Sequence, residues 1–373
     1  MRSEQGSPAL PAVLERSDLA PQPLAGAWTL PACAYTDEAV AVFEGEAVFA
    51  RSWQCIGRSD AVREAGAHIV AEVAGRPILA VRGNDGLLRG FFNVCKHRGG
   101  PLALADGCSP RLQCKYHGWT YTLEGQLRSA PEMREADAFR PEDIRLDPVF
   151  VGEWQGFVFA AIGAPPADLD ATAAGIVGRI APLRLDGLGL RRRVSYELAC
   201  NWKLYVDNYL EGYHLPHVHP GLNRLLDCRH YTTELAAWYS DQTSPLRGEG
   251  NIYGEGAAHY LYVWPNLMLN VLPGRLQLNL VVPVSVRECR VLFDYYYADG
   301  DAAGASERID ADLAFSDEVQ REDVAICERV QRGLESGAYR AGRLSPKREA
   351  GVHHFQNLWR AACLRMLGEA QAA

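Results

Sequence analysis

The chain has 373 residues, of which 48% are hydrophobic and 23% charged, and its formal net charge is -8. This composition is globular, and the length exceeds that of one typical domain, so we expect two domains. Acidic and basic residues are interspersed apart from the basic run 191–193, which argues against a nucleic-acid partner. No apolar run is long enough for a membrane span, and the start of the chain mixes charges with prolines instead of forming a signal-peptide core. We therefore expect a soluble cytoplasmic protein with a loose N-terminal arm over residues 1–26.

The first half of the chain has β character. Runs at 67–75, 76–83 and 156–163 are rich in β-branched and aromatic residues and are separated by Gly, Asp and Asn. This pattern predicts a small antiparallel β domain, which we place at 27–165.

The second half mixes strands and helices. The segment APPADLD at 164–170 is typical of a linker, so we place a second domain at 166–373. The predicted elements of this domain are a strand at 191–198, a helix at 201–214, strands at 259–265, 267–274, 276–284 and 289–298, and helices at 316–336 and 352–367. The expected fold class is α+β, with an antiparallel sheet flanked by helices.

Two of the ten cysteines have histidine neighbours. In the segment CKHRGGPLALADGCSPRLQCKYHGW, Cys95 is followed by His97 and Cys114 by His117. Two loops can then each offer one thiolate and one imidazole to a common centre. A Rieske 2Fe-2S cluster needs this set, because two cysteines hold one of its irons and two histidines hold the other. The other cysteines are mostly solitary, which is typical of a reducing compartment.

A Cys2His2 zinc site is the alternative reading of these four residues. Zinc fingers place both cysteines before both histidines, whereas the order here is Cys, His, Cys, His. Glycines at positions 99, 100 and 118 also supply the close backbone approach that cluster loops need. Cys108 lies between the two loops, but ADGCSP is typical of a turn, and we interpret this cysteine as structural.

The motifs CKHRGGPL and CKYHGWTY resemble the Rieske domain of ring-hydroxylating and related oxygenases. Respiratory-chain Rieske proteins carry an additional disulfide cysteine in each loop, and the matching positions here are Gly100 and Tyr116. The resemblance is therefore to the oxygenases. It implies a Rieske domain followed by a catalytic domain of helix-grip type with a mononuclear Fe(II).

The segment NWKLYVDNYLEGYHLPHVHP holds three histidines, His214, His217 and His219. Non-haem Fe(II) oxygenases bind iron with two histidines and one carboxylate and leave positions open for dioxygen and substrate. Helical spacing pairs His214 with His217. Pro216 weakens that argument, because it disfavours helical geometry at the residue before it. The pattern of the oxygenases, an acid followed by histidines three and eight residues later, falls on Glu211, His214 and His219. By this resemblance His214 and His219 bind iron and His217 lines the pocket, while His217 as the ligand stays an alternative.

The third iron ligand must come from elsewhere. The helix predicted at 316–336 offers five carboxylates, at Asp317, Glu318, Glu322, Asp323 and Glu328. An apolar stripe is formed by Val319, Ile326, Val330 and Leu334. Asp323 falls near the middle of this stripe, Glu322 at its edge and Glu328 on the opposite face. A carboxylate that faces the core needs a partner, and iron is one. The oxygenases also have an aspartate at the corresponding ED pair. A buried ion pair between Asp323 and Arg360 is the alternative.

Glu211 has a second role by resemblance. In the oxygenases the acid at this position links an iron-bound histidine to a cluster histidine of the neighbouring subunit in a trimer. Glu211 would then connect His214 with His117 of another copy. Asp207, on the same predicted helix, is our other catalytic candidate.

The resemblance implies that the reduced cluster passes an electron to the iron, which activates O2 for insertion into a small organic substrate. No flavin or nicotinamide fingerprint and no plant-type ferredoxin cysteine run is present in the sequence, so NAD(P)H would be used by a partner reductase, with or without a ferredoxin. The chain is most similar to the branch with choline monooxygenase, glycine betaine demethylase and the carnitine and stachydrine oxygenases. Its substrates are quaternary or tertiary amines, which aromatic side chains can bind.

The aromatic candidates for such a pocket are Trp202, Tyr205, Tyr209, Tyr213, Tyr262 and Trp264. We single out Tyr205 and Trp264, together with His217, as substrate-pocket residues. The competing functions are an aromatic-ring hydroxylase or aryl-ether O-demethylase and, from a different class, a stand-alone Rieske electron carrier. The carrier would not need the His214, His219 and Asp323 set.

Overall fold

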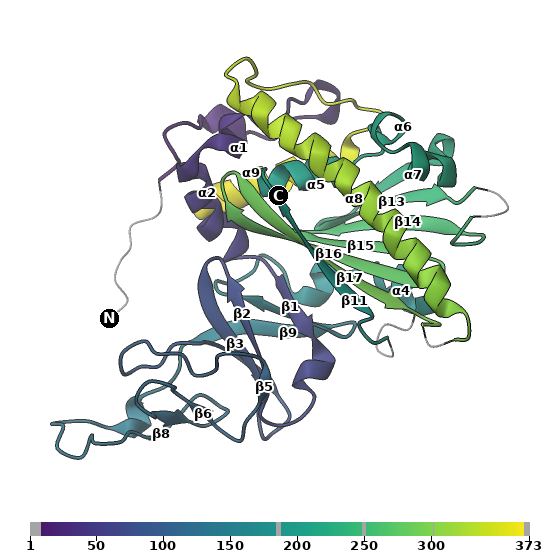
Figure 1. Cartoon of the computed structure of the whole chain (residues 1–373). Helices are drawn as coiled ribbons and strands as arrows, with labels where there is room; N and C mark the ends of the chain where they lie inside the picture. Colours follow the sequence, from purple (N-terminus) through teal and green to yellow (C-terminus); the bar gives the residue numbers. More distant parts are fainter. Residues whose placement is uncertain (1–8, 184–187, 248–250, 301, 369–373) are drawn as a thin grey trace. The chain divides into compact units, whose positions relative to one another are not determined.

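The structure is a computed structural model that describes residues 9–183, 188–247, 251–300 and 302–368 (Figure 1). The chain divides into two compact units. One comprises Phe49–Ala171, and the other combines Met1–Val48 with Thr172–Ala373. Each unit is described separately below. Among the described residues, every helix is too short or too polar to cross a membrane.

The unit at residues 49–171 is built from two antiparallel sheets. The larger sheet has the strand order β1-β10-β9-β4-β3-β2-β5, and the smaller has β6-β7-β8. The bounds are β1 Gln54–Arg58, β2 Ala67–Val73, β3 Arg76–Arg82, β4 Leu88–Phe92, β5 Gly107–Cys108, β6 Leu112–Gln113, β7 Thr120–Tyr121, β8 Leu127–Ser129, β9 Pro148–Trp154 and β10 Phe157–Ala161, with short helices η4 Ser59–Val62 and η5 Pro141–Asp143. The three strands predicted in this region are confirmed.

The second unit contains an antiparallel sheet with the strand order β11-β17-β16-β15-β14-β13-β12. The bounds are β11 Arg192–Leu198, β12 Thr232–Leu235, β13 Tyr239–Pro245, β14 Ala257–Val263, β15 Leu267–Leu272, β16 Arg275–Ser285 and β17 Glu288–Tyr297. β12 and β13 were not predicted, because TTEL and YSDQTSP are polar and lack the apolar alternation of a half-buried strand.

Helices cover this sheet, and α8 crosses its face in Figure 1. The long helices are α5 Trp202–Tyr209, α8 Ala305–Glu335 and α9 Ala350–Met366. The shorter helices of this unit are α1 Cys33–Thr36, α2 Glu38–Glu44, α4 Val177–Ile180, α6 Leu215–Val218 and α7 Pro220–Leu225, with η1 Arg16–Leu19, η2 Leu24–Gly26, η6 Ala181–Leu183 and η8 Cys228–His230. Along the chain, η3 Gly45–Phe49 and α3 Leu169–Thr172 span the boundaries between the two units. The α+β fold class is confirmed.

The N-terminal segment differs from the prediction. Residues 27–48 belong to the second unit, because Glu44 is buried and accepts hydrogen bonds from Lys203 Nζ at 2.5 Å and from Trp359 Nε1 at 2.6 Å. Nor are residues 9–26 a loose arm. Leu19 is buried, and the Asp18 carbonyl accepts a hydrogen bond from Arg360 Nε at 2.9 Å. Arg360 therefore binds the N-terminal segment, and the alternative ion pair between Arg360 and Asp323 is not formed.

The predicted apolar stripe of α8 was also wrong. Val330 is 41% exposed, whereas the buried positions are Ala305, Ile309, Asp312, Ser316, Gln320, Cys327 and Gln331. These positions recur at steps of three, four or seven residues, so they form one face of the helix. Most of this face is polar. Ser316 and Gln320 line a cavity at the candidate active site, whereas Asp312 pairs with Arg275 and Gln331 accepts a hydrogen bond from the Asn201 amide.

Candidate metal centres

The two cysteine–histidine loops have the same backbone pattern. The Cys95 amide donates to the Gly100 carbonyl at 2.8 Å, and the Cys114 amide donates to the Trp119 carbonyl at 2.8 Å. In each loop a glycine amide returns a hydrogen bond to the cysteine carbonyl, from Gly99 at 3.0 Å and from Gly118 at 3.1 Å. Both glycines have a positive φ, of 74° and 73°, which other residues rarely adopt. Two similar turns thus present the side chains.

The four predicted cluster ligands lie together. Cys95 and Cys114 are buried, and the rings of His97 and His117 have their centroids 4.6 Å apart. His97 Nδ1 is buried and has no hydrogen-bond partner among the described residues. A Cβ atom at Gly100 would lie 2.9 Å from Cys114 Sγ, so only glycine leaves room for that sulfur. An orphaned imidazole nitrogen beside two buried thiols fits a Rieske cluster.

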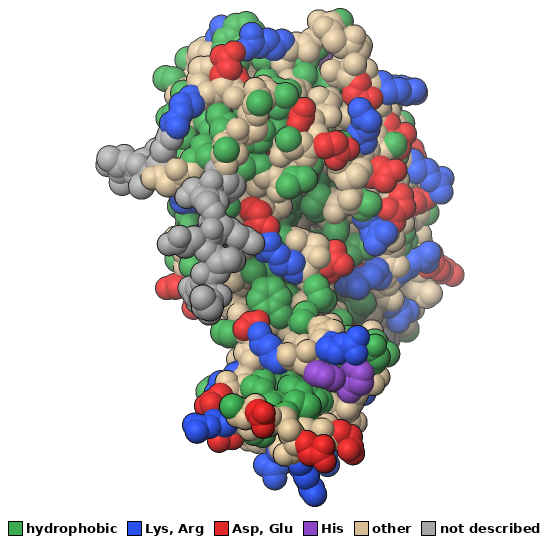
Figure 2. All heavy atoms as spheres, turned by 90° about the vertical axis from the view of Figure 1, so that its left-hand side faces the viewer, with side chains coloured by type: hydrophobic (Ala, Val, Ile, Leu, Met, Phe, Trp, Pro, Cys, Tyr) green, Lys and Arg blue, Asp and Glu red, His purple; other side chains and the backbone are tan. Residues whose placement is uncertain are grey.

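The electrostatics of this site favour a neutral His117. Partial desolvation lowers the pKa of His117, and the charges of His97 and Arg98 lower it further. Burial raises the pKa of the Cys95 thiol, while the Tyr121 hydroxyl, 3.3 Å from its sulfur, opposes that effect. His117 is exposed, and Figure 2 shows histidine side chains at the surface next to Lys and Arg. A metal cluster would remove the thiol protons.

Cys108 does not belong to the cluster ligands. It is exposed in β5, and its thiol donates to the Ala65 carbonyl at 3.7 Å.

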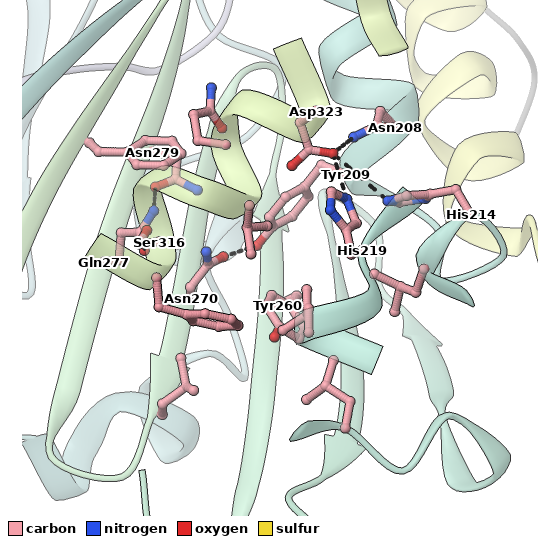
Figure 3. Close-up of a pocket in the computed structure, with 18 of the residues that line it drawn as sticks. Asn208, Tyr209, His214, His219, Tyr260, Asn270, Gln277, Asn279, Ser316 and Asp323 are labelled. Atoms are coloured by element: carbon pink, nitrogen blue, oxygen red, sulfur yellow. Dashed lines mark hydrogen bonds and ion pairs between the residues drawn. The ribbon is translucent and has the colours of Figure 1, made fainter. Parts of the chain in front are cut away.

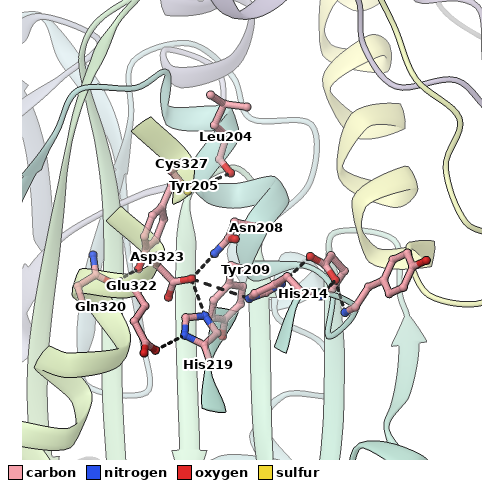
Figure 4. Close-up of polar contacts among 12 residues, drawn as sticks. Leu204, Tyr205, Asn208, Tyr209, His214, His219, Gln320, Glu322, Asp323 and Cys327 are labelled. Atoms are coloured by element: carbon pink, nitrogen blue, oxygen red, sulfur yellow. Dashed lines mark hydrogen bonds and ion pairs between the residues drawn. The ribbon is translucent and has the colours of Figure 1, made fainter. Parts of the chain in front are cut away.

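His214, His219 and Asp323 converge in the second unit (Figure 4). Their ligand atoms all lie within 4.8 Å of one another. His219 Nε2 lies 2.9 Å from Asp323 Oδ1, and His214 Nε2 lies 3.9 Å from the same oxygen. Two imidazoles and one carboxylate at such distances are the donor set of a non-haem Fe(II) site. The structure therefore brings the three predicted ligands together.

Local helix breaks place the two histidines. The predicted helix at 201–214 ends at Tyr209, and α6 begins only after His214, with Pro216 in its first turn. His219 stands between α6 and α7, with a φ of -119° that ends the first helix. His217 is exposed on α6 and does not line the cavity beside the site. Our assignment of His217 to the substrate pocket does not fit this placement.

Three further side chains orient the ligands. His214 Nδ1 donates to Glu211 Oε1 at 2.6 Å, and His219 Nδ1 donates to Glu322 Oε2 at 2.7 Å. These bonds leave each Nε2 atom turned toward Asp323, which also accepts a hydrogen bond from Asn208 Nδ2 at 2.5 Å. Burial opposes a charged His219, but Asp323 and Glu322 together raise its pKa. Second partners of this kind fix the tautomer and angle of metal-bound histidines.

Two of these partners had no signal in the sequence pattern. Glu322 fell at the edge of the wrongly placed stripe, and Asn208 is a common type of helix residue. Their contacts with His219 and Asp323 become apparent only when α8 is seen packed beside α5.

A cavity of about 110 Å³ opens beside the three converging ligands (Figure 3). Tyr205, predicted for the substrate pocket, lines it. Trp264 does not, because it is buried and packs against Phe355 with a centroid distance of 6.1 Å. The other lining residues include Tyr209, Tyr231, Tyr253, Tyr260, Phe293 and Phe315, and the polar Asn270, Arg275, Gln277, Asn279, Ser316 and Gln320.

Asp207 is not part of the converging cluster. It accepts hydrogen bonds from the Tyr35 hydroxyl at 2.6 Å and from Gln356 Nε2 at 3.2 Å, and it lines a second cavity, of about 560 Å³. Burial raises the pKa of Asp207 to about 7. Our prediction that it is catalytic has no support in this position. Glu211, by contrast, lines both cavities.

Both halves of the chain match known protein families. Residues 52–141 match the Rieske [2Fe-2S] domain, and residues 185–365 match the ring hydroxylating alpha subunit (catalytic domain). A choline monooxygenase of Arabidopsis thaliana is 36% identical over 90% of this chain and 83% of its own length. The chain belongs to the Rieske oxygenase alpha subunits. It is a Rieske non-haem iron oxygenase that carries a 2Fe-2S cluster and a mononuclear iron. A stand-alone Rieske carrier is thereby excluded.

Other relatives of this Rieske oxygenase are named for similar compounds. A carnitine monooxygenase oxygenase subunit of Escherichia coli K12 is 32% identical over 89% of this chain and 93% of its own length. The crystal structure of the quaternary ammonium Rieske monooxygenase CntA with L-carnitine is 29% identical, has a TM-score of 0.79, and covers 92% of this chain and 99% of that one. A naphthalene 1,2-dioxygenase structure at 18% identity and a TM-score of 0.71 shows the shared fold alone.

Proposed function

We propose that this oxygenase hydroxylates or oxidatively demethylates a small quaternary or tertiary amine. In this proposal Cys95, His97, Cys114 and His117 hold the cluster, and His214, His219 and Asp323 hold the iron. The observation that carries it is the convergence of two imidazoles and a carboxylate on one side of an aromatic-lined cavity. When bound, the iron supplies the activation of dioxygen, with electrons that arrive through the cluster.

The protein's own residues prepare this site. Glu211 and Glu322 keep the Nδ1 protons in place, so that the Nε2 lone pairs of His214 and His219 are available for the metal. Asn208 holds the carboxylate of Asp323. The three ligands come from the start of α6, the junction of α6 and α7, and α8, and all three line the cavity. The cavity side remains open for substrate.

The cavity lining supports an amine substrate. Tyrosine and phenylalanine faces attract cations, and seven such residues line the cavity. The relatives named for choline and carnitine, and the CntA structures with L-carnitine and with gamma-butyrobetaine, have quaternary ammonium compounds in common. By contrast, oxidation of an aromatic ring or an aryl ether is supported only by fold similarity. We therefore favour the amine.

We further infer that the oxygenase works as a homotrimer with a flavin and iron–sulfur reductase, with or without a ferredoxin, in the cytoplasm. Inter-subunit electron transfer is known from the structure of another quaternary ammonium Rieske monooxygenase that oxidises carnitine. Glu211 binds His214 and faces the second cavity, and His117 is exposed. These positions support a path from His117 of one copy through Glu211 to His214 of another.

Oxygen consumption by the holoenzyme with an NADH-dependent reductase tests the amine proposal. The substrates are glycine betaine, gamma-butyrobetaine, L-carnitine, stachydrine and choline, with vanillate as an aryl ether. We expect coupled oxygen uptake, and 18O from labelled O2 in the product or released formaldehyde, with at least one amine. Turnover of vanillate with none of the amines would contradict the proposal.

A further inference from the structure

α8 and β16 run side by side in matched steps. Arg275 Nε on β16 lies 2.8 Å from Asp312 Oδ2 on α8, and two residues further along β16, Gln277 Oε1 accepts a hydrogen bond from Ser316 Oγ at 3.2 Å. Two strand residues advance about 6.6 Å, and four helix residues advance about 6 Å. The two elements therefore stay in step. The next pair in this register is Asn279 on β16 with Gln320 on α8.

The third pair differs from the first two. No hydrogen bond joins Asn279 to Gln320 in the described structure, although both side chains are only 1% exposed and both line the cavity. Gln320 Nε2 is buried and has no hydrogen-bond partner among the described residues. Buried amide groups without partners are costly, so they mark a place where a ligand or water is expected.

Arg275 determines which way the Asn279 amide faces. A guanidinium can only donate, so Gln277 must accept from Arg275 with its oxygen. Its nitrogen then donates to Asn279 Oδ1 at 2.8 Å, as Figure 3 shows, and Asn279 Nδ2 is left to face the cavity. Among the described residues nothing accepts from Asn279 Nδ2. The Arg275 guanidinium thus polarises the side-chain amides of Gln277 and Asn279, and the last group in this row, Asn279 Nδ2, is a hydrogen-bond donor.

The tyrosine on α5 supports the same direction for Gln320. Tyr205 donates its hydroxyl hydrogen to Gln320 Oε1 at 2.7 Å (Figure 4), which leaves Nε2 as the open group. Gln320 lies one helical turn before Asp323, so this donor is close to the iron ligands. Two amide donors therefore border one part of the cavity.

We propose that Asn279 and Gln320 are specificity-determining residues that bind a carboxylate of the substrate. This inference rests on the proposed amine oxygenase function and narrows it to betaines, which carry both a quaternary ammonium and a carboxylate. Two N–H donors can each reach one carboxylate oxygen, and hydrogen bonds to an ionised group are stronger than neutral ones. The hydroxyl of choline has one oxygen and would meet two donors with no acceptor for its own hydrogen.

Calorimetric binding to the anaerobic holoenzyme tests this specificity without turnover. Glycine betaine and choline share the trimethylammonium group and differ in carboxylate against alcohol. In Gln320→Glu the tyrosine keeps its acceptor, but the open donor becomes an acidic oxygen, and Asn279→Asp makes the same exchange on β16. We expect each variant to bind glycine betaine on the order of 10- to 100-fold more weakly, with a change of about threefold or less for choline.

The exposed Glu318 of α8 offers a control, because Glu318→Gln changes charge on the same helix and should leave both affinities unchanged. Cluster absorption and thermal melting show which variants are folded. One folded variant, Gln320→Glu or Asn279→Asp, is enough for the comparison of the two ligands. If both ligands lose affinity equally, or neither does, the carboxylate assignment is overturned. If the wild-type enzyme turns over choline and binds no betaine, the specificity is wrong and the amine function stands. If it binds neither choline nor any of the betaines named above, both proposals fail.

Discussion

The four candidate cluster ligands come from one stretch of sequence, residues 95–117, whereas the three candidate iron ligands come from residues 214–219 and from Asp323. Backbone hydrogen bonds within each loop shape the first site. Side-chain hydrogen bonds between α5, the short helices and α8 shape the second. The first site therefore depends on local turn geometry, and the second on how a helix more than a hundred residues away is aligned.

If the cluster site depends only on its own two loops, removing one ligand should abolish the cluster without disturbing the iron site. Cys114→Ala removes a buried thiolate from one iron, so we expect loss of the cluster absorption and of all turnover, with mononuclear iron retained. Cys108→Ala, in the same stretch but outside the site, is the control and should leave the visible spectrum unchanged. Loss of the absorption in the Cys108 variant as well would show that our ligand assignment is wrong. Iron analysis and visible absorption supply both readouts.

The converse change addresses the iron. Asp323→Ala removes the carboxylate that both histidines face, and we expect turnover to fall by at least about three orders of magnitude while the cluster EPR signal persists. Glu318→Ala on the same helix is the matched control. Normal turnover in the Asp323 variant would mean that the third ligand has been misassigned.

A weaker effect is expected where a residue acts through a ligand. Glu322→Gln replaces the carboxylate bound to His219 Nδ1 with a neutral amide, which we expect to lower Fe(II) affinity on the order of 10- to 100-fold. Fe(II) titration of apo-protein with an intact cluster measures it. If backbone hydrogen bonds alone positioned the iron ligands, as they shape the cluster loops, the Fe(II) affinity of the variant would equal that of the wild type.

The smallest effect concerns pH. Burial raises the pKa of Asp207 to about 7, so between about pH 4 and 7 the unfolded chain loses this proton while the folded chain keeps it. Stability from Asp207 is thus present at low pH and is lost as pH rises through 7, up to about 4 kcal/mol. Asp207→Asn should flatten this loss. Melting temperatures at pH 5.5 and 8 measure it, and an equal decline in both proteins would contradict the shifted pKa.

The two sites also differ in how far the sequence predicts them. The spacing of Cys95, His97, Cys114 and His117 indicates a cluster directly, because each pair needs only its own loop. Asp323 was chosen partly from an apolar stripe that proved wrong, and the resemblance to known oxygenases pointed to the same residue.

Other positions could not be derived from pattern at all. The buried face of α8 is polar at Ser316 and Gln320 because these residues border a cavity, and at Asp312 because it pairs with Arg275. Hydrophobic periodicity cannot detect such a face. Trp264 was expected in the pocket because it is aromatic. A large aromatic side chain is equally suited to the hydrophobic core, and Trp264 packs there against Phe355. β12 and β13 were missed since their residues are polar.

In our assignment one chain holds both a cluster and a separate iron. Iron and acid-labile sulfide per chain, measured on anaerobically purified wild-type and Asp323→Ala protein after Fe(II) reconstitution, distinguish this arrangement from a cluster alone. We predict about three irons and two sulfides in the wild type and about two of each in the variant, with the same low-average-g EPR signal after reduction. About two irons and two sulfides in both proteins would contradict the account, because Asp323 would then hold no metal.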